Sequence, residues 1–208
     1  MDSKVVILDT VTLRHFLLLG RIPLLRRWLN GDLSIPETVH QELLRGVTAH
    51  DPRTLSVDPQ IARVRSDRFR AYPAQVSDLG IQILPALLLE DLGPDSLKVF
   101  AALESQKRPP IHAGEKEVIL WAYERGYRIC TDDRGAYQTI RNLQQGLGPG
   151  IVARPSLEVV GTPGLLAEQI RQGHLDPAEA AAFWAEVREV WRRAPNKDLA
   201  EVLAGDCW

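Results

Sequence analysis

Only two cysteines, Cys130 and Cys207, occur among the 208 residues of the chain. A disulfide framework is therefore not expected, and this cysteine content favours a reducing cytoplasm as the compartment. No apolar run approaches the roughly 20 residues that a membrane-spanning helix needs. The start of the chain, MDSKVVILDT, also lacks the pattern of a signal peptide. We expect a soluble cytoplasmic protein with no membrane partner.

A strong net charge is missing as well, because 25 basic residues oppose 27 acidic ones. No overall basic field indicates nucleic-acid binding, although a local basic rim could still contact nucleic acid. The five histidines show no zinc-type spacing. No glycine-rich phosphate loop follows the first apolar run, and no G-x-S-x-G motif occurs. These absences argue against zinc sites, nucleotide binding and serine-hydrolase chemistry.

The remaining composition is that of an ordinary globular protein, with 45% hydrophobic and 25% charged residues. A chain of this length suits one domain of generous size. We predict one domain over residues 1–175, with an arginine-rich insertion at about 47–84 that contains one short helix. Residues 176–208 are predicted to form a helix and a loose tail that pack on the same domain.

Short apolar or β-branched runs alternate with helical patterns along most of the chain. The helical segments have apolar side chains at helical spacing, and glycine or asparagine ends several of them. Predicted strands cover 4–8, 33–35, 81–84, 127–131 and 157–160; predicted helices cover 13–20, 22–29, 37–46, 95–104, 114–124, 133–143, 162–173 and 177–191. This alternation predicts an α/β fold with three α/β/α layers and a mostly parallel central sheet.

Acidic residues follow two of the predicted strands. Asp9 comes directly after the first strand, and Asp132 and Asp133 come after the strand at 127–131. Because ligands of parallel α/β sheets bind at the carboxyl ends of the strands, we expect these carboxylates at one edge. Glu42, within a predicted helix, and Glu115, at a helix start, are further candidates. Each acid alone also has a simpler interpretation, as a helix cap, a first-turn residue or a surface side chain.

Carboxylates gathered at one edge of a sheet would repel one another unless a cation neutralised them. Oxygen ligands of this kind select Mg²⁺ or Mn²⁺. Such an ion lowers the pKa of a bound water and stabilises charge on a phosphate, which is the chemistry of phosphodiester hydrolysis. A phosphatase is less favoured, because it would normally have an aspartate two residues after Asp9, where Val11 stands.

Two further groups of side chains have more than one interpretation. Arg63, Arg65, Arg68 and Arg70 form either a solvated face or a rim that binds phosphates. The tryptophans of the C-terminal helix belong either to the core or to an interface, so a homodimer through this helix is one option.

Four segments, in this order, resemble the PIN-domain family of metal-dependent nucleases. They are VVILDT, LSIPETVHQELLRG, HAGEKEVILWAYERGYRICTDDRGA and VVGTPGLLAEQIRQGHL. The resemblance is greatest to the bacterial and archaeal branch related to VapC toxins of toxin–antitoxin pairs. It implies a PIN-like fold, a Mg²⁺- or Mn²⁺-dependent endoribonuclease activity on RNA, and an antitoxin protein as partner. The alternative is a non-catalytic PIN-like module that binds nucleic acid or protein.

The resemblance also implies roles for individual residues. The catalytic acids would be Asp9, Glu42, Glu115 and Asp133, and the metal ligands would be Asp9, Glu115, Asp132 and Asp133. Thr10 and Thr131 would be supporting hydroxyls. At the third acidic position many members have aspartate where this chain has Glu115, with Glu117 the less favoured candidate. The arginine-rich stretch lies outside the four resembling segments; on the ribonuclease hypothesis, Arg63, Arg65, Arg68 and Arg70 are the candidates to hold the RNA backbone.

Overall fold

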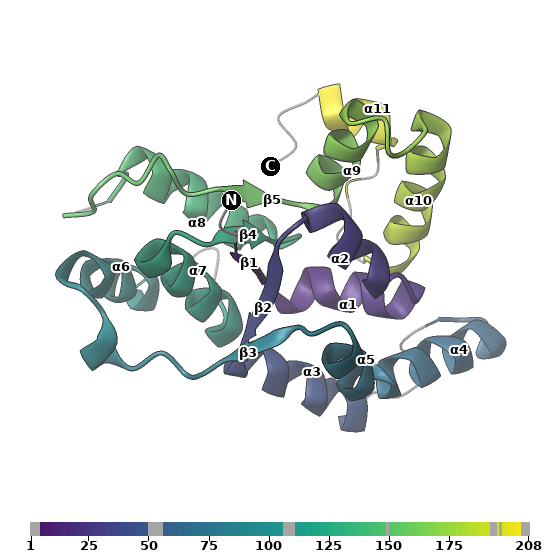
Figure 1. Cartoon of the computed structure of the whole chain (residues 1–208), viewed down its shortest axis with the longest axis horizontal. Coiled ribbons are helices and arrows are strands. Elements are labelled where there is room, and N and C mark those ends of the chain that lie inside the picture. The colour runs from purple at the N-terminus through teal and green to yellow at the C-terminus, as the bar shows by residue number, and fades with distance from the viewer. Residues whose placement is uncertain are drawn as a thin grey trace.

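A five-stranded sheet forms the centre of the computed structural model, which describes residues 5–49, 56–105, 111–148, 150–191, 195 and 197–204. The strands are β1 (Val5–Leu8), β2 (Asp32–Pro36), β3 (Gln82–Leu84), β4 (Arg128–Cys130) and β5 (Val159–Val160). Their spatial order is β3-β2-β1-β4-β5, and every neighbouring pair is parallel (Figure 1). The predicted α/β class with a parallel central sheet is confirmed.

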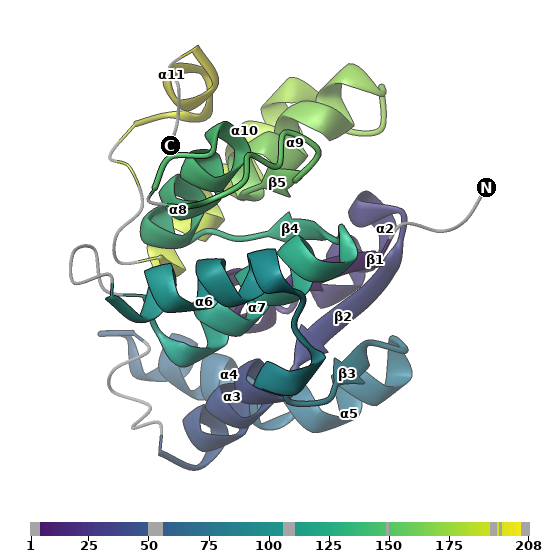
Figure 2. The same ribbon diagram turned by 90° about the vertical axis from the view of Figure 1, so that its left-hand side faces the viewer.

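Helices cover both faces of this sheet, giving three α/β/α layers (Figure 2). One face carries α6 (Pro94–Ser105), α7 (Ala113–Arg125) and α8 (Arg134–Gln145). The other face carries α1 (Thr10–Leu19), α2 (Ile22–Leu29), α9 (Thr162–Arg171) and α10 (Pro177–Val190). At the β3 end of the sheet lie α3 (Glu37–Ala49), α4 (Pro59–Arg70) and α5 (Tyr72–Asp78).

The sequence of β1 explains its central place. Its run VVIL has no polar residue, and Val6, Ile7 and Leu8 are at most 1% exposed. Central strands of a parallel sheet are covered on both faces, so they need such a continuous apolar run rather than an alternating one. The edge strand β3 differs, because Gln82 and Ile83 are exposed there.

An aromatic cluster joins the C-terminal helix to the rest of the core. The ring centroid of Phe183 on α10 lies 5.5 Å from that of Phe16 on α1 and 5.3 Å from that of Trp28 on α2. Aromatic pairs in this range contribute about 0.5–1.5 kcal/mol each beyond their burial. Trp184 and Trp191 are also buried, so these two tryptophans belong to the core of the chain. Residues 177–191 therefore pack on the main domain.

The arginine-rich segment holds two helices, α4 and α5, so the prediction of one short helix was wrong. Helix α4 begins at a regular cap, in which Asp58 Oδ1 accepts hydrogen bonds from the backbone N–H groups of Gln60 and Ile61, at 2.8 and 3.3 Å. Pro59 occupies the first helical position. The many charges of the segment hid this start signal. The edge strand predicted at 81–84 is present as β3.

The C-terminal region also differs from its prediction. Residues Leu199–Ala204 form a further helix, α11, which packs against α9 and α10. Leu199 and Val202 are buried in that contact, so the prediction of a loose tail was wrong for this part. Cys130 is buried in β4, whereas Cys207 lies outside the described residues. Within the described ranges, no helix is both long and apolar enough to cross a membrane.

Candidate functional site

The carboxyl ends of β1 and β4 meet at the middle of the sheet. Leu8, the last residue of β1, lies opposite Cys130, the last residue of β4. The backbone N–H of Asp9 donates to the carbonyl of Cys130 at 3.2 Å, which extends this pairing by one residue. Asp9 therefore leaves the sheet beside the segment Thr131–Asp133, as the sequence predicts for acids that follow adjacent parallel strands.

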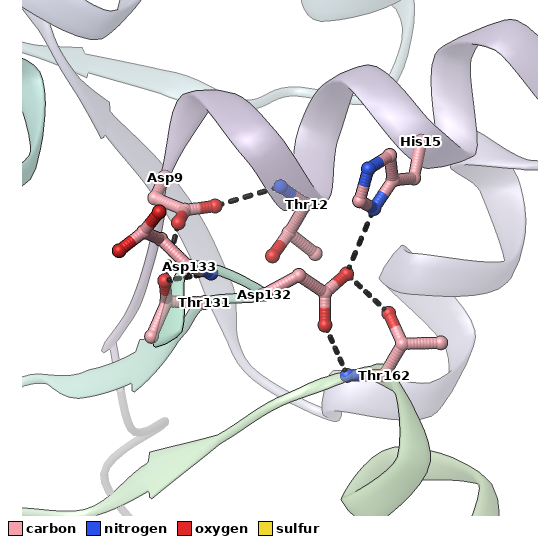
Figure 3. A network of polar contacts seen from close by, with 7 residues as sticks. All are labelled: Asp9, Thr12, His15, Thr131, Asp132, Asp133 and Thr162. Atoms are coloured by element: carbon pink, nitrogen blue, oxygen red, sulfur yellow. Dashed lines mark hydrogen bonds and ion pairs between the residues drawn. The ribbon is translucent and has the colours of Figure 1, made fainter. Parts of the chain in front are cut away.

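Asp9 is held by both carboxylate oxygens (Figure 3). Its Oδ1 accepts a hydrogen bond from the backbone N–H of Thr12 at 2.7 Å, which makes Asp9 the N-cap of α1. Its Oδ2 accepts the hydroxyl of Thr131. The same Thr131 hydroxyl accepts the backbone N–H of Asp133 at 3.1 Å. Thr131 thus connects the carboxylate that follows β1 to the backbone that follows β4.

Asp133 caps α8 in the same manner, since its Oδ1 accepts the backbone N–H of Ala136 at 2.9 Å. The simpler interpretation of Asp9 and Asp133 as helix caps is therefore correct. It does not remove them from a site, because both caps stand at the same edge of the sheet. A helix N-terminus also favours nearby negative charge. The two carboxylates can serve as caps and as part of an anionic centre.

Glu42 joins three helices at this edge. Its Oε2 accepts the hydroxyl of Thr10 on α1 at 2.5 Å, and its Oε1 accepts the backbone N–H of Gly114 on α7 at 3.3 Å. A Cβ atom on Gly114 would lie 3.0 Å from both oxygens of Glu42, so the close approach depends on glycine. Glu42 is half-buried and points inward from α3, which excludes its interpretation as a free surface side chain.

Glu115 lies in the first turn of α7 and is 8% exposed. Its Oε2 accepts the backbone N–H of His112 at 2.9 Å, one half of a capping box. Burial raises the pKa of Glu115 above its usual range, and the charges of Asp133 and Glu42 raise it further. Glu115 therefore stands within electrostatic reach of both other acids.

These contacts bring four acids to one edge of the sheet, and we call this set the acidic cluster. Its members are Asp9, Glu42, Glu115 and Asp133. Thr131 joins Asp9 to Asp133, and Thr10, beside Asp9 in the chain, binds Glu42. Burial raises the pKa of Asp9 to about 7, with a smaller contribution from the charge of Asp132. Ionising this cluster therefore costs free energy that a cation would offset.

The donor atoms of the acidic cluster are carboxylate oxygens with nearby hydroxyls. Hard divalent cations such as Mg²⁺ and Mn²⁺ prefer this donor set, so the residues fit such an ion by chemistry and by charge. Across the described part of the chain, however, no three His, Cys, Asp or Glu side chains are already grouped as ligands of a metal ion. The acids converge without forming a finished coordination shell.

Asp132 turns away from the acidic cluster (Figure 3). Its Oδ1 accepts the backbone N–H of Thr162 at 2.7 Å, and its Oδ2 lies 2.6 Å from the Thr162 hydroxyl and 3.1 Å from Nδ1 of His15. The predicted metal ligand Asp132 is thus placed beside the cluster, within a separate buried group. No sequence motif marks His15 or Thr162 as a partner of Asp132. Gly161 caps α9, and Thr162 is its first helical residue.

Glu117 has a structural place that separates it from Glu115. Its Oε2 accepts the hydroxyl of Thr38, at the start of α3, and its Oε1 accepts the backbone N–H of Leu87 at 2.8 Å. Glu117 therefore ties the segment after β3 and the start of α3 to α7. This supports the choice of Glu115 over Glu117 as the acid of the site.

The four predicted RNA-binding arginines do not share one face of α4. Arg65 is 8% exposed, and its Nη2 lies 3.2 Å from Oε2 of Glu189 on α10. Arg68 donates from Nη1 to the carbonyl of Leu18 on α1 at 2.9 Å. Only Arg63 and Arg70 of this set are exposed. Arg65 and Arg68 fasten α4 to its neighbours. Arg63 and Arg70 are left for contact with a phosphate backbone, and Nη1 of Arg70 lies 3.6 Å from Oδ1 of Asp67 in an exposed ion pair.

A scan against models of protein families, a search of curated proteins and a search of solved structures each found no match. The resemblance to PIN-domain nucleases therefore stays a prediction from the sequence segments. Function has to be argued from the geometry of the acidic cluster.

Proposed function

We propose that the chain is a metal-dependent endoribonuclease that hydrolyses phosphodiester bonds of RNA in the cytoplasm. The observation that carries this proposal is the convergence of Asp9, Glu42, Glu115 and Asp133 on one edge of the sheet, from the ends of two strands and from two helices. The order of these acids along the chain also agrees with the resemblance to PIN-domain nucleases.

In the proposed site Asp9 and Asp133 would hold a Mg²⁺ or Mn²⁺ ion, and Glu42 and Glu115 would contribute directly or through waters. The ion, when bound, makes water more acidic and offsets negative charge on the phosphate. Thr131 keeps Asp9 and Asp133 together, because its hydroxyl bonds to both residues. Thr10 and Gly114 fix the carboxylate of Glu42. Glu42 or Glu115 would accept a proton from the attacking water.

Partners follow from the same proposal. A toxin-like nuclease needs an antitoxin protein that covers the acidic cluster, and we propose such a partner. A homodimer through the C-terminal helix stays a prediction. Trp184 and Trp191 would not form its interface, because both are buried within the chain. The non-catalytic alternative is favoured by one observation, the lack of a finished ligand group among the described residues.

The direct test is cleavage of a fluorescently labelled single-stranded RNA by the purified full-length protein. We expect cleavage with Mn²⁺ or Mg²⁺ and none after EDTA treatment. A folded protein that binds this RNA but leaves it intact with either ion would overturn the nuclease proposal and support the binding module. Folding is checked by circular dichroism in every buffer.

The exposed arginines of α4 give a separate prediction. The double variant Arg63→Ala, Arg70→Ala should bind RNA more weakly, with a salt dependence smaller by about two phosphate contacts. Its thermal midpoint should stay near that of the wild type, because both side chains are exposed. The matched control is Arg125→Ala, Arg171→Ala. These two exposed arginines lie at the ends of α7 and α9 that are farthest from the acidic cluster. Equal weakening in both double variants would contradict a specific role for α4.

A further inference from the structure

A buried polar group lies beside the acidic cluster, and we call it the Asp132 network. It consists of Asp132, His15 and Thr162 (Figure 3). The side chains of His15 and Asp132 are 5% and 0% exposed. A buried carboxylate is costly unless hydrogen bonds satisfy it. Asp132 meets this need with three contacts, namely the backbone N–H and the hydroxyl of Thr162 and Nδ1 of His15.

The Asp132 network joins separate elements of the fold. His15 comes from α1, Asp132 from the end of β4, and Thr162 from the junction of β5 and α9. The imidazole of His15 also packs against the indole of Trp191 at the end of α10, with ring centroids 5.2 Å apart. Asp132, which follows the end of β4, is therefore held by α1 and by α9 at the same time.

The backbone at this place has few other restraints. Thr131, Asp132 and Asp133 belong to neither β4 nor α8. Backbone hydrogen bonds hold the two ends of this link, since the Thr131 N–H donates to the carbonyl of Val160 at 2.9 Å and the carbonyl of Asp133 accepts the N–H of Tyr137 at 2.9 Å. Between these ends, side-chain hydrogen bonds fix the link at Asp132. Thr131 and Asp133 point to the acidic cluster, while Asp132, between them in the chain, points to His15 and Thr162.

We infer that Asp132 is a positioning residue of the site rather than a metal ligand. Held by His15 and Thr162, it sets the direction in which Thr131 and Asp133 leave the sheet. Through the hydroxyl of Thr131 it also sets the carboxylate of Asp9. The effect of this inference on catalysis rests on the proposed function, whereas its effect on the geometry of the site does not.

Thr162 offers a matched pair of variants for the test. Thr162→Val keeps the shape and the backbone N–H but removes the hydroxyl that binds Asp132, whereas Thr162→Ser keeps that hydroxyl. The reporters are the backbone N–H groups of Thr12 and Ala136, which donate to Asp9 and Asp133. We expect amide exchange of both reporters to accelerate by about tenfold or more in Thr162→Val. In Thr162→Ser it should stay near the wild-type rate.

A merely structural role would lower global stability without singling out these two amides. Val187→Ala supplies that comparison, because Val187 is fully buried in α10 and makes no contact described for the Asp132 network. If the two reporters accelerate no more in Thr162→Val than in Val187→Ala at equal global stability, the inference is wrong. Should Thr162→Val fail to fold, His15→Asn and His15→Gln replace the pair. Asparagine can place an N–H near the position of Nδ1, while glutamine places it near Nε2.

Activity separates this inference from the proposed function. If the wild type cleaves RNA, Thr162→Val should lower kcat with little change in KM, and Thr162→Ser should restore it. If the wild type cleaves no RNA, the nuclease proposal fails, and the amide-exchange comparison still decides whether Asp132 positions Asp9 and Asp133.

Discussion

Asp133→Asn is expected to lower the rate of Mn²⁺-dependent RNA cleavage by at least about 100-fold, the order of magnitude lost when one group that stabilises a transition state electrostatically is removed. The reason is that the variant removes a negatively charged carboxylate from the acidic cluster, and a divalent cation needs such carboxylates as ligands. The fold should survive, because asparagine caps a helix about as well as aspartate. The bond from the Ala136 N–H to Oδ1 can remain in the variant. A loss of cleavage would then result from the missing catalytic carboxylate and not from unfolding.

The matched control for this variant is Asp78→Asn, which removes an exposed carboxylate from the end of α5. Initial rates are measured with the same labelled RNA for both variants and for the wild type, with thermal midpoints recorded alongside. A contaminating metal-independent ribonuclease is excluded first, because its cleavage would persist in EDTA. Equal rates with well-folded protein would exclude Asp133 from the chemistry, and with it the acidic cluster as the site of cleavage.

The sheet edge could be predicted because it depends on local signals. An apolar run followed by an acid appears at Leu8-Asp9, and the strand YRIC leads into Thr131-Asp132-Asp133 in the same way. In a parallel sheet every such run ends at one edge, so the approximate meeting of these acids follows from the alternation of strands and helices alone. Adjacent pairing of β1 and β4 then brings them side by side.

The directions of side chains within that edge could not be predicted in the same way. Asp132 and Asp133 are neighbours of equal chemistry, and nothing in their types says which one faces the cluster. The choice depends on His15 and Thr162, which are distant in sequence and meet Asp132 only in the folded chain. Glu42 is a similar case, since its contact with Gly114 depends on how α3 packs against α7.

The sequence of α4 contains a helical pattern that is not apparent when only its charges are counted. Ala62, Arg65 and Phe69 recur at helical spacing and are all buried, so they mark the inner face of the helix. A long side chain such as arginine can lie on that face while its guanidinium reaches an acid, here Glu189. The position of Arg65 in the helical repeat, and not its residue type, distinguishes it from the exposed Arg63.

Burial of Asp9 should make the stability of the protein fall with rising pH. The pKa of Asp9 is raised from an ordinary 3.8 to about 7, mainly because burial penalises its charged form. Between these values the native state keeps a proton that the unfolded chain has released. Stability from this group is therefore complete below about pH 4, declines as the pH rises to about 7, and then stays level. The decline amounts to about 4 kcal/mol in the free energy of unfolding.

Asp9→Asn isolates this effect, because asparagine can cap α1 but does not ionise. We expect the difference in unfolding free energy between the wild type and Asp9→Asn, measured by urea denaturation, to shift by about 4 kcal/mol in favour of the variant from pH 4 to pH 8. Glu115, whose pKa is also raised, titrates in both proteins and largely cancels. Asp78→Asn should follow the wild type.

Divalent cations should change the same difference in unfolding free energy between the wild type and Asp9→Asn. Mg²⁺ at pH 8 should stabilise the wild type, because a cation that binds ionised Asp9 stabilises the native state by mass action. The same addition should stabilise Asp9→Asn far less. Parallel pH profiles of the wild type and Asp9→Asn would show that Asp9 is ionised at little cost, contrary to its burial. If the pH profiles diverge but Mg²⁺ stabilises neither protein, Asp9 is strained by burial alone, and the acidic cluster does not bind the cation that the proposed nuclease requires.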